Sequence, residues 1–167
     1  MNNDLFKYGL LLIILPLLQV SIFNNIDLLG YINPYFYITF VFVYPIKKEK
    51  ISLIITSFLL GLFIDILTND GGIHAFSIVF IAFIRLFLLR MITRKSFDDA
   101  ELNIRIIPFS SLILWIAILT FIHHFILFLL EQFSFSHFAI LLQKTFLTTT
   151  FSIILIIFGL QLFLKRK

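Results

Sequence analysis

The chain has no cysteine, and only 13% of its 167 residues are charged. Without cysteine it can form no disulfide, no thiolate metal site and no dithiol redox centre. A soluble globular domain typically has about 25% charged residues. Because 60% of the residues are hydrophobic and the mean hydropathy is +1.08, the composition excludes a soluble domain and indicates an integral membrane protein.

Six apolar stretches separated by short polar connections predict an all-α integral membrane protein, a six-helix transmembrane bundle in one domain, 1–167. Spans of about 20 residues each leave no room for a soluble catalytic module. The first stretch resembles a signal peptide, but it lacks a cleavage site and we expect it to be retained. The expected helices cover residues 5–23, 28–46, 51–67, 73–92, 107–130 and 138–164.

The basic residues are unevenly distributed. The connections inside each pair of stretches, around residues 24–30, 68–72 and 131–137, contain no Lys or Arg. Positive residues favour the cytoplasmic side, so this alternation predicts cytoplasmic termini. The net charge of +4 indicates contact with anionic lipid and no nucleic-acid partner. Eleven of the 13 basic residues lie in four places: Lys7; Lys47, Lys48 and Lys50; Arg90, Arg94, Lys95 and Arg105; and Lys165, Arg166 and Lys167.

The second stretch is interrupted by two prolines. Asn33 and Pro34 are typical of a helix start, and Pro45 of a helix end. The helix between them has about 11 residues and a length of roughly 17 Å, which is short for a crossing. A broken or half-buried segment is the alternative to a full helix. We expect it to cross, because otherwise every later basic loop would lie outside.

Two ionisable residues lie near the connection between the third and fourth stretches. An ionisable side chain in hydrocarbon costs about 2.5–3.5 kcal/mol on insertion scales. Asp65 and His74 lie at similar depths on either side of Gly71 and Gly72, so we expect them to form a hydrogen-bonded pair. Gly61, one turn before Asp65, lets another helix approach closely. A contact surface for another membrane protein and a proton or ligand site are the alternatives for this pair.

Arg85 is the third ionisable residue inside a predicted span. Its axial offset from Asp65, near 10 Å, argues against a direct ion pair. We expect its side chain to snorkel toward the cytoplasmic headgroups. The alternative is an internal partner, such as a carbonyl group freed by Pro16 or Pro45.

The remaining polar residues give no pattern typical of catalysis or metal binding. His123 and His124 point about 100° apart on a helix, and neither has a ligand residue at helical spacing, so no metal or cofactor is expected. We expect one to face the bundle and the other an interface, and Lys144 to pair with Glu131 or snorkel outward. Trp115 is expected to face lipid or to pack. Enzyme motifs are missing, so we expect a protein that is not an enzyme.

One stretch resembles a known family. Residues 61–76 contain G-L-x-x-D, a short turn and G-x-x-A, followed by an arginine, and this resembles MreD, a rod shape-determining membrane protein, in its Bacteroidetes-like form. About 25 residues carry the resemblance. The matching positions, candidates for a structural or partner-binding role, are Gly61, Asp65, Gly71, Gly72, His74 and Arg85.

The resemblance implies a non-enzymatic scaffold of the bacterial cell-wall elongation complex in the inner membrane. Its expected partner is an MreC-like single-span coiled-coil protein. Through this partner it would act with a class B penicillin-binding protein, RodA and MreB to maintain cell shape. The family is also similar in fold to the S subunits of energy-coupling-factor transporters. A small-solute or lipid-binding transporter subunit is therefore the alternative function.

Overall fold

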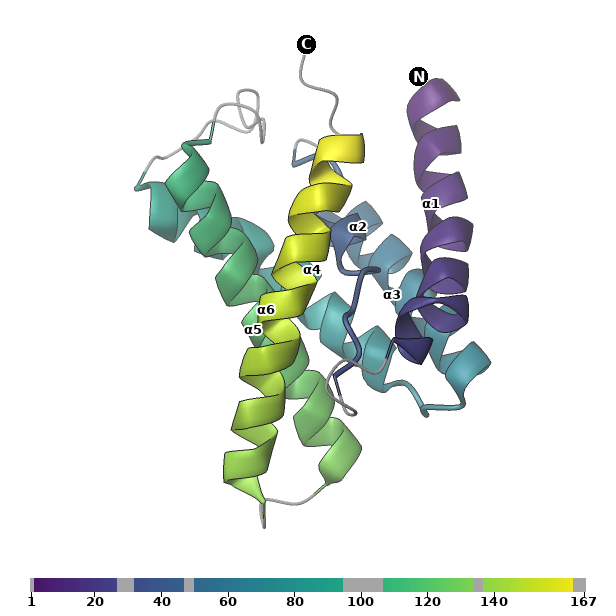
Figure 1. Ribbon diagram of the computed structural model, residues 1–167. Coiled ribbons are helices and arrows are strands. Elements are labelled where there is room, and N and C mark those ends of the chain that lie inside the picture. The colour runs from purple at the N-terminus through teal and green to yellow at the C-terminus, as the bar shows by residue number, and fades with distance from the viewer. Residues whose placement is uncertain (1, 27–31, 47–49, 95–106, 134–136, 164–167) are drawn as a thin grey trace.

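Five long helices and two short ones form the structure, a computed structural model that describes residues 2–26, 32–46, 50–94, 107–133 and 137–163 (Figure 1). Regular secondary structure in these ranges is helical. The short helices are η1 (Phe23–Asn25) and α2 (Thr39–Val43). The long ones are α1 (Asn2–Ser21), α3 (Lys50–Thr68), α4 (Ile73–Thr93), α5 (Phe109–Gln132) and α6 (Phe138–Phe163).

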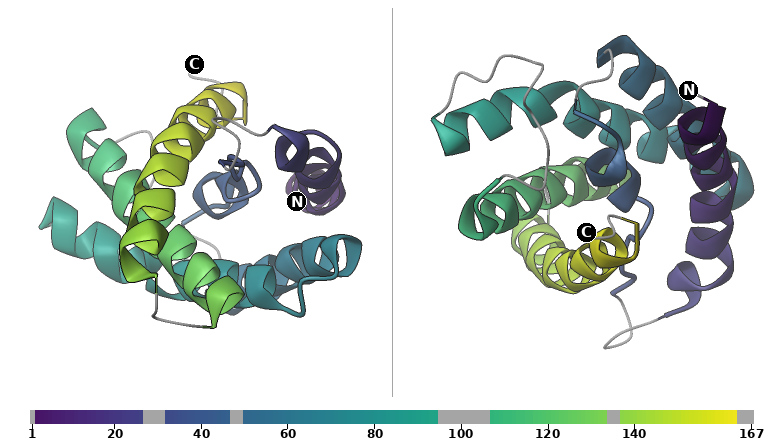
Figure 2. Two further views of the ribbon diagram at one scale, coloured as in Figure 1. Left: turned by 60° about the horizontal axis from the view of Figure 1, so that its bottom comes forward. Right: turned by 90° about the horizontal axis from the view of Figure 1, so that it is seen from above.

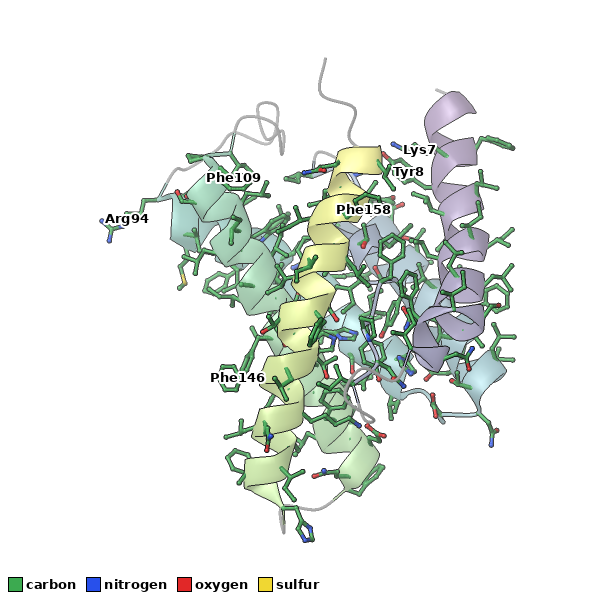
Figure 3. The ribbon with its side chains drawn as sticks, in the orientation of Figure 1. Lys7, Tyr8, Arg94, Phe109, Phe146 and Phe158 are labelled. Carbon is green, nitrogen blue, oxygen red and sulfur yellow. The ribbon has the colours of Figure 1, made fainter. Side chains whose placement is uncertain are left out.

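Each long helix is long and apolar enough to cross a membrane. Large apolar side chains are exposed on their outer faces, and Phe109, Phe146 and Phe158 illustrate this on α5 and α6 (Figure 3). In water such a surface would be unfavourable, whereas lipid chains solvate it. The structure therefore confirms an all-helical fold in the described residues, and its five long apolar helices are compatible with a multi-pass membrane bundle.

The five long helices form an incomplete ring. α1 packs on α3, α3 on α4, α4 on α5, and α5 on α6. The short helix α2 lies inside this ring, and α6 and α1 are its two ends (Figure 2). The start of α1 and the end of α6 lie at one end of the bundle, and the α3–α4 and α5–α6 connections lie at the other (Figure 1).

The second predicted span is not a continuous helix. Residues 28–31 lie outside the described part, and in residues 32–46, called the central segment below, only Thr39–Val43 is α-helical. Pro34 cannot donate a hydrogen bond, and the backbone is irregular around it. At the other end Tyr44 is extended, with ψ 131°, before Pro45. The part of the chain that the structure describes therefore has five long helices where the sequence predicts six, and the broken-segment alternative describes residues 32–46 correctly.

The central segment is buried among the helices of the ring. The side chains of Tyr37, Phe40 and Phe42 are fully inaccessible. Seven further apolar residues of the segment are at most 7% exposed: Ile32, Phe36, Ile38, Val41, Val43, Tyr44 and Ile46. Apolar burial of this extent stabilises the segment inside the ring. The segment therefore supplies a large part of the core, which it shares with inward-facing side chains of the long helices.

Side chains from the ring supply hydrogen bonds to the irregular backbone of the central segment. Gln19 of α1 accepts through Oε1 from the backbone N–H groups of Phe36 (2.8 Å) and Tyr37 (3.3 Å), and donates from Nε2 to the Pro34 carbonyl (3.1 Å). Ser152 of α6 accepts from the N–H of Tyr35 at 2.9 Å. Buried backbone groups without partners are costly, so these contacts make a non-helical segment tolerable inside the bundle.

Replacing Gln19 with leucine is expected to destabilise the protein by about 2 kcal/mol, because two backbone N–H groups and one carbonyl lose their buried partners. The thermal unfolding midpoint of the detergent-solubilised protein measures this. Gln161→Leu is the matched control, because that glutamine is exposed on α6. Equal midpoints for the two variants would contradict the role of Gln19.

The sequence places the other helix boundaries within a few residues of those observed. The fifth helix begins at Phe109 rather than residue 107, because Pro108 has the extended ψ of 139° and occupies the position before the first turn. The basic residues Lys47, Lys48, Lys95 and Arg105, and those at 165–167, lie outside the described part of the chain. The orientation that they predict is therefore untested.

Candidate functional site

The connection between α3 and α4 is a tight turn with three residues at positive φ. Asn69 has φ 61°, Gly71 has φ 66° and Gly72 has φ 99°. The N–H of Asp70 bonds to the Asp65 carbonyl at 3.1 Å, five residues back, in the hydrogen bond typical of a Schellman motif. Glycine reaches positive φ without steric cost, so Gly71 and Gly72 fix the geometry of this turn.

Asp65 caps the N-terminus of α4 from the neighbouring helix. Its Oδ1 accepts from the N–H of His74 at 3.0 Å and its Oδ2 from the N–H of Ala75 at 2.9 Å. Gly72, at the N-cap position, has no side chain that could accept these donors. The positive end of the helix dipole also favours the carboxylate. The predicted pairing of Asp65 with His74 is confirmed, although the donor is the backbone and not the imidazole.

Gly61 allows the two helices to approach at the level of this cap. A Cβ atom built on Gly61 would lie 2.4 Å from Cα of Ala75, 2.7 Å from its nitrogen and 2.9 Å from the carbonyl carbon of His74. All three atoms belong to the backbone of α4, so no side chain can move aside. The expected close approach at Gly61 is therefore confirmed.

His74 joins a buried chain of polar side chains. Its Nε2 lies 3.2 Å from Oδ2 of Asp70, and its Nδ1 lies 2.9 Å from the hydroxyl of Tyr37. The same hydroxyl lies 2.8 Å from Nε2 of His123 on α5. The hydrogen bond from His74 holds the pKa of the Asp70 carboxyl below its usual range. The turn, the central segment and α5 are thus connected by three consecutive hydrogen bonds.

Arg85 does not snorkel toward the headgroups, and that expectation is wrong. The side chain is buried, with 2% exposure. It donates from Nη1 to the carbonyls of Val41 (2.6 Å) and Tyr44 (3.0 Å), and from Nη2 to the carbonyl of Pro45 (2.9 Å). Because Pro45 has no N–H, the Val41 carbonyl, four residues earlier, has lost its helical donor. The alternative, a carbonyl freed by Pro45, is therefore the correct one.

Two further expectations concern α5 and α6. Nζ of Lys144 lies 3.1 Å from Oε2 of Glu131, which confirms that pair. His123 and His124 are both fully buried, so the prediction that one faces an interface is wrong. Nδ1 of His124 lies 3.1 Å from Oγ1 of Thr149 on α6. Adjacent histidines are both enclosed because the central segment fills the space on one side and α6 covers the other.

Trp115 packs inside the bundle and does not face lipid. It is fully buried, and its Nε1 donates to the backbone carbonyl of Arg85 at 2.8 Å. Its ring contacts Phe42 of the central segment edge to face, with centroids 5.2 Å apart. Of the two alternatives predicted for this tryptophan, packing is therefore correct.

Two residues that are central to this arrangement, Gln19 and Tyr37, are not among the site residues predicted from the sequence. Gln19 stands out as an amide in an apolar helix, and that is the signal by which its role could have been found. Tyr37 gives no such signal, because it belongs to a run of aromatic and apolar residues and its hydroxyl finds partners only in the folded bundle. Of the sequence-predicted residues, Gly61, Asp65, Gly71, Gly72 and His74 come together at the α3–α4 turn, while Arg85 lies apart, against the central segment.

These features define a class: a multi-pass helical membrane protein whose ring of long helices holds a buried, irregular central segment. Comparison with known proteins yields no matching family model, no matching curated protein and no matching solved structure.

Proposed function

We propose that this chain is a non-enzymatic scaffold of the MreD type in the bacterial inner membrane, with both termini cytoplasmic. Its partner is an MreC-like single-span coiled-coil protein, which connects it to the peptidoglycan synthases of the elongation complex. The contact lies at the end of the bundle that carries the α3–α4 turn. This end is the outer one if the basic residues are cytoplasmic.

The proposal is supported by the contacts that the residues resembling the MreD pattern make in the structure. Both carboxylate oxygens of Asp65 bind backbone N–H groups of α4, and Gly61 removes the side chain that would separate the helices. Gly71 and Gly72 set the turn. These residues fix the shape of one exposed edge of the bundle, which is the contribution expected of a docking surface.

The path of the central segment supports an even number of crossings. Gln19, in the last turn of α1, binds the segment near residues 34–37. Arg85, in the half of α4 farther from the turn, binds it near residues 41–45. The segment thus runs from the turn end of the bundle toward the end where α1 begins. If the segment counts as the second crossing, the chain crosses six times, and the four basic clusters lie on the same side of the membrane.

The filled interior favours a scaffold over a transporter subunit. In the described residues, the middle of the helix ring is occupied by the side chains of Tyr37, Phe40 and Phe42, all fully buried. A solute bound there would first have to displace this segment. The transporter alternative therefore needs a rearrangement that a scaffold does not.

Affinity purification of the tagged protein in mild detergent tests the proposal, with identification of the proteins that accompany it. We expect a single-span coiled-coil protein with the native chain. Asp65→Leu should reach the membrane yet retain about tenfold less partner, because losing a cap of about 1–2 kcal/mol distorts the edge that the partner contacts.

Glu131→Gln is the matched control for this experiment. It neutralises another carboxylate at the same end of the bundle, which pairs with Lys144 and does not touch the turn. We expect it to retain the partner at the native level. Undiminished recovery of the partner by Asp65→Leu would refute the docking role of the capped turn, and a bound solute in place of a protein would support the transporter alternative.

A further inference from the structure

Four side chains form a continuous hydrogen-bonded chain from the α3–α4 turn into the bundle. Asp70 is at the accessible end, with a side chain 36% exposed, whereas the side chain of His74 is 5% exposed. Tyr37 and His123 are fully inaccessible. The successive distances are 3.2, 2.9 and 2.8 Å. The chain therefore connects an aqueous carboxylate to a buried imidazole by three hydrogen bonds.

The ionised carboxylate determines the direction of every bond in this chain. A carboxylate only accepts, so Nε2 of His74 must carry the hydrogen, and in the neutral ring Nδ1 is then an acceptor. The Tyr37 hydroxyl must donate to that Nδ1, and its oxygen accepts from Nε2 of His123. A neutral His123 protonated at Nε2 has a bare Nδ1. Among the described residues Nδ1 of His123 has no hydrogen-bond partner. This agrees with a bare Nδ1, because an acceptor without a donor is tolerated more easily than a donor without an acceptor.

One additional proton reverses the chain. If that proton binds Nδ1 of His74, both ring nitrogens carry a hydrogen: Nε2 donates to Asp70, and Nδ1 donates to the Tyr37 oxygen. The Tyr37 hydroxyl then donates to Nε2 of His123, which gives up its hydrogen to solvent when the bundle opens transiently, while Nδ1 takes one up from solvent, so that His123 stays neutral. Each nitrogen and oxygen keeps an ordinary valence, and only one proton is added. Nδ1 of His123 thereby changes from an acceptor to a donor.

We propose that Asp70, His74, Tyr37 and His123 form a proton-responsive relay, in which protonation at the α3–α4 turn sets the hydrogen-bonding direction of a buried imidazole on α5. Because Tyr37 belongs to the central segment, the relay links the proton activity at that end of the bundle to the contacts that hold the segment in place. The inference does not depend on the partner named in the proposed function.

The relay lies among other titratable and charged groups, and the test must separate their effects. Asp65 of α3 binds the backbone N–H of His74 and adds a negative charge nearby. The ring of His124 lies 5.3 Å from that of His123, and the ring of Tyr35 lies 5.8 Å from that of His74. The Glu131–Lys144 pair supplies compensating charges from α5 and α6.

Nitrogen-15 NMR of histidine-labelled full-length protein in detergent or lipid discs tests the relay directly. The chain has only four histidines, and the ring-nitrogen shifts distinguish protonated from bare nitrogens. We expect His123 to be protonated at Nε2 near neutral pH. When pH is lowered from about 8 to about 4, Nε2 of His123 should become bare and Nδ1 protonated, together with the appearance of a hydrogen on Nδ1 of His74. A proton on Nδ1 at neutral pH, or no change across this range, would overturn the proposal.

Two variants and one control test which residues of the relay respond to the added proton. Asp70→Asn removes the charge that stabilises the added proton, so the His123 transition should move to lower pH by about one unit or more. Tyr37→Phe keeps the ring but breaks the chain, and His123 should then no longer follow His74. Glu131→Gln removes a nearby charge that makes no hydrogen bond within the relay, so it should shift the transition by less than Asp70→Asn does. An unaltered transition in Asp70→Asn would show that the carboxylate does not set the direction.

Discussion

Gly61→Ala is expected to destabilise the protein by about 3 kcal/mol or more, because overpacking against atoms that cannot move usually costs about 1–3 kcal/mol and here the obstacle is backbone. The added methyl group would lie 2.4 Å from Cα of Ala75. Relieving the overlap requires α3 and α4 to separate, which lengthens the hydrogen bonds from His74 and Ala75 to Asp65. The thermal unfolding midpoint in detergent should fall by roughly 6–12 °C.

Gly9→Ala is the matched control. A Cβ atom on Gly9 has nothing within 4 Å, and the residue lies inside the long helix α1. Alanine favours helix over glycine by about 1 kcal/mol, so this variant should be as stable as the native chain or slightly more stable. If Gly61→Ala matched Gly9→Ala in its midpoint, the close contact between α3 and α4 would be disproved.

Arg85→Leu is expected to destabilise the protein by about 4 kcal/mol, because the carbonyls of Val41, Tyr44 and Pro45 lose their donors inside the bundle and each costs about 1–3 kcal/mol when left unpaired. The loss of an unfavourable buried charge offsets part of this total. Trp115, the only tryptophan, bonds to the Arg85 carbonyl, so its fluorescence reports the unfolding transition at this position.

Arg90→Leu serves as the comparison for this variant. It removes the same charge from the same helix, but Arg90 is exposed. We expect its unfolding midpoint to stay within about 2 °C of the native value, since exposed substitutions usually change stability by less than about 0.5 kcal/mol. Equal losses in the two variants would mean that charge, rather than the carbonyl contacts, accounts for the effect of Arg85.

Much of the α3–α4 turn is predictable from the sequence. The two glycines between apolar stretches indicate the turn, and Asp65 and His74 lie at similar depths because helices advance by a fixed rise per residue. The sequence does not show that Asp65 binds the backbone of α4 rather than the imidazole of His74. That choice depends on how closely the helices pack, and Gly61 controls their separation.

The sequence does not determine which groups the Arg85 side chain contacts. An arginine far into an apolar helix can reach the headgroups or find internal acceptors, and both satisfy its charge. The acceptors here come from a segment at least 40 residues earlier in the chain, and one of them, the Val41 carbonyl, is free because Pro45 cannot donate to it. Only the folded arrangement brings these groups together.

The amino-acid composition and the length of the apolar stretches indicate a helical membrane protein, because hydrocarbon-spanning segments have few other ways to satisfy their backbone hydrogen bonds. Proline, glycine and polar residues also locate the ends of the long helices to within a few residues. The tertiary structure decided which side chains support the buried segment at residues 32–46. Those contacts join residues far apart in the chain, and no local pattern specifies them.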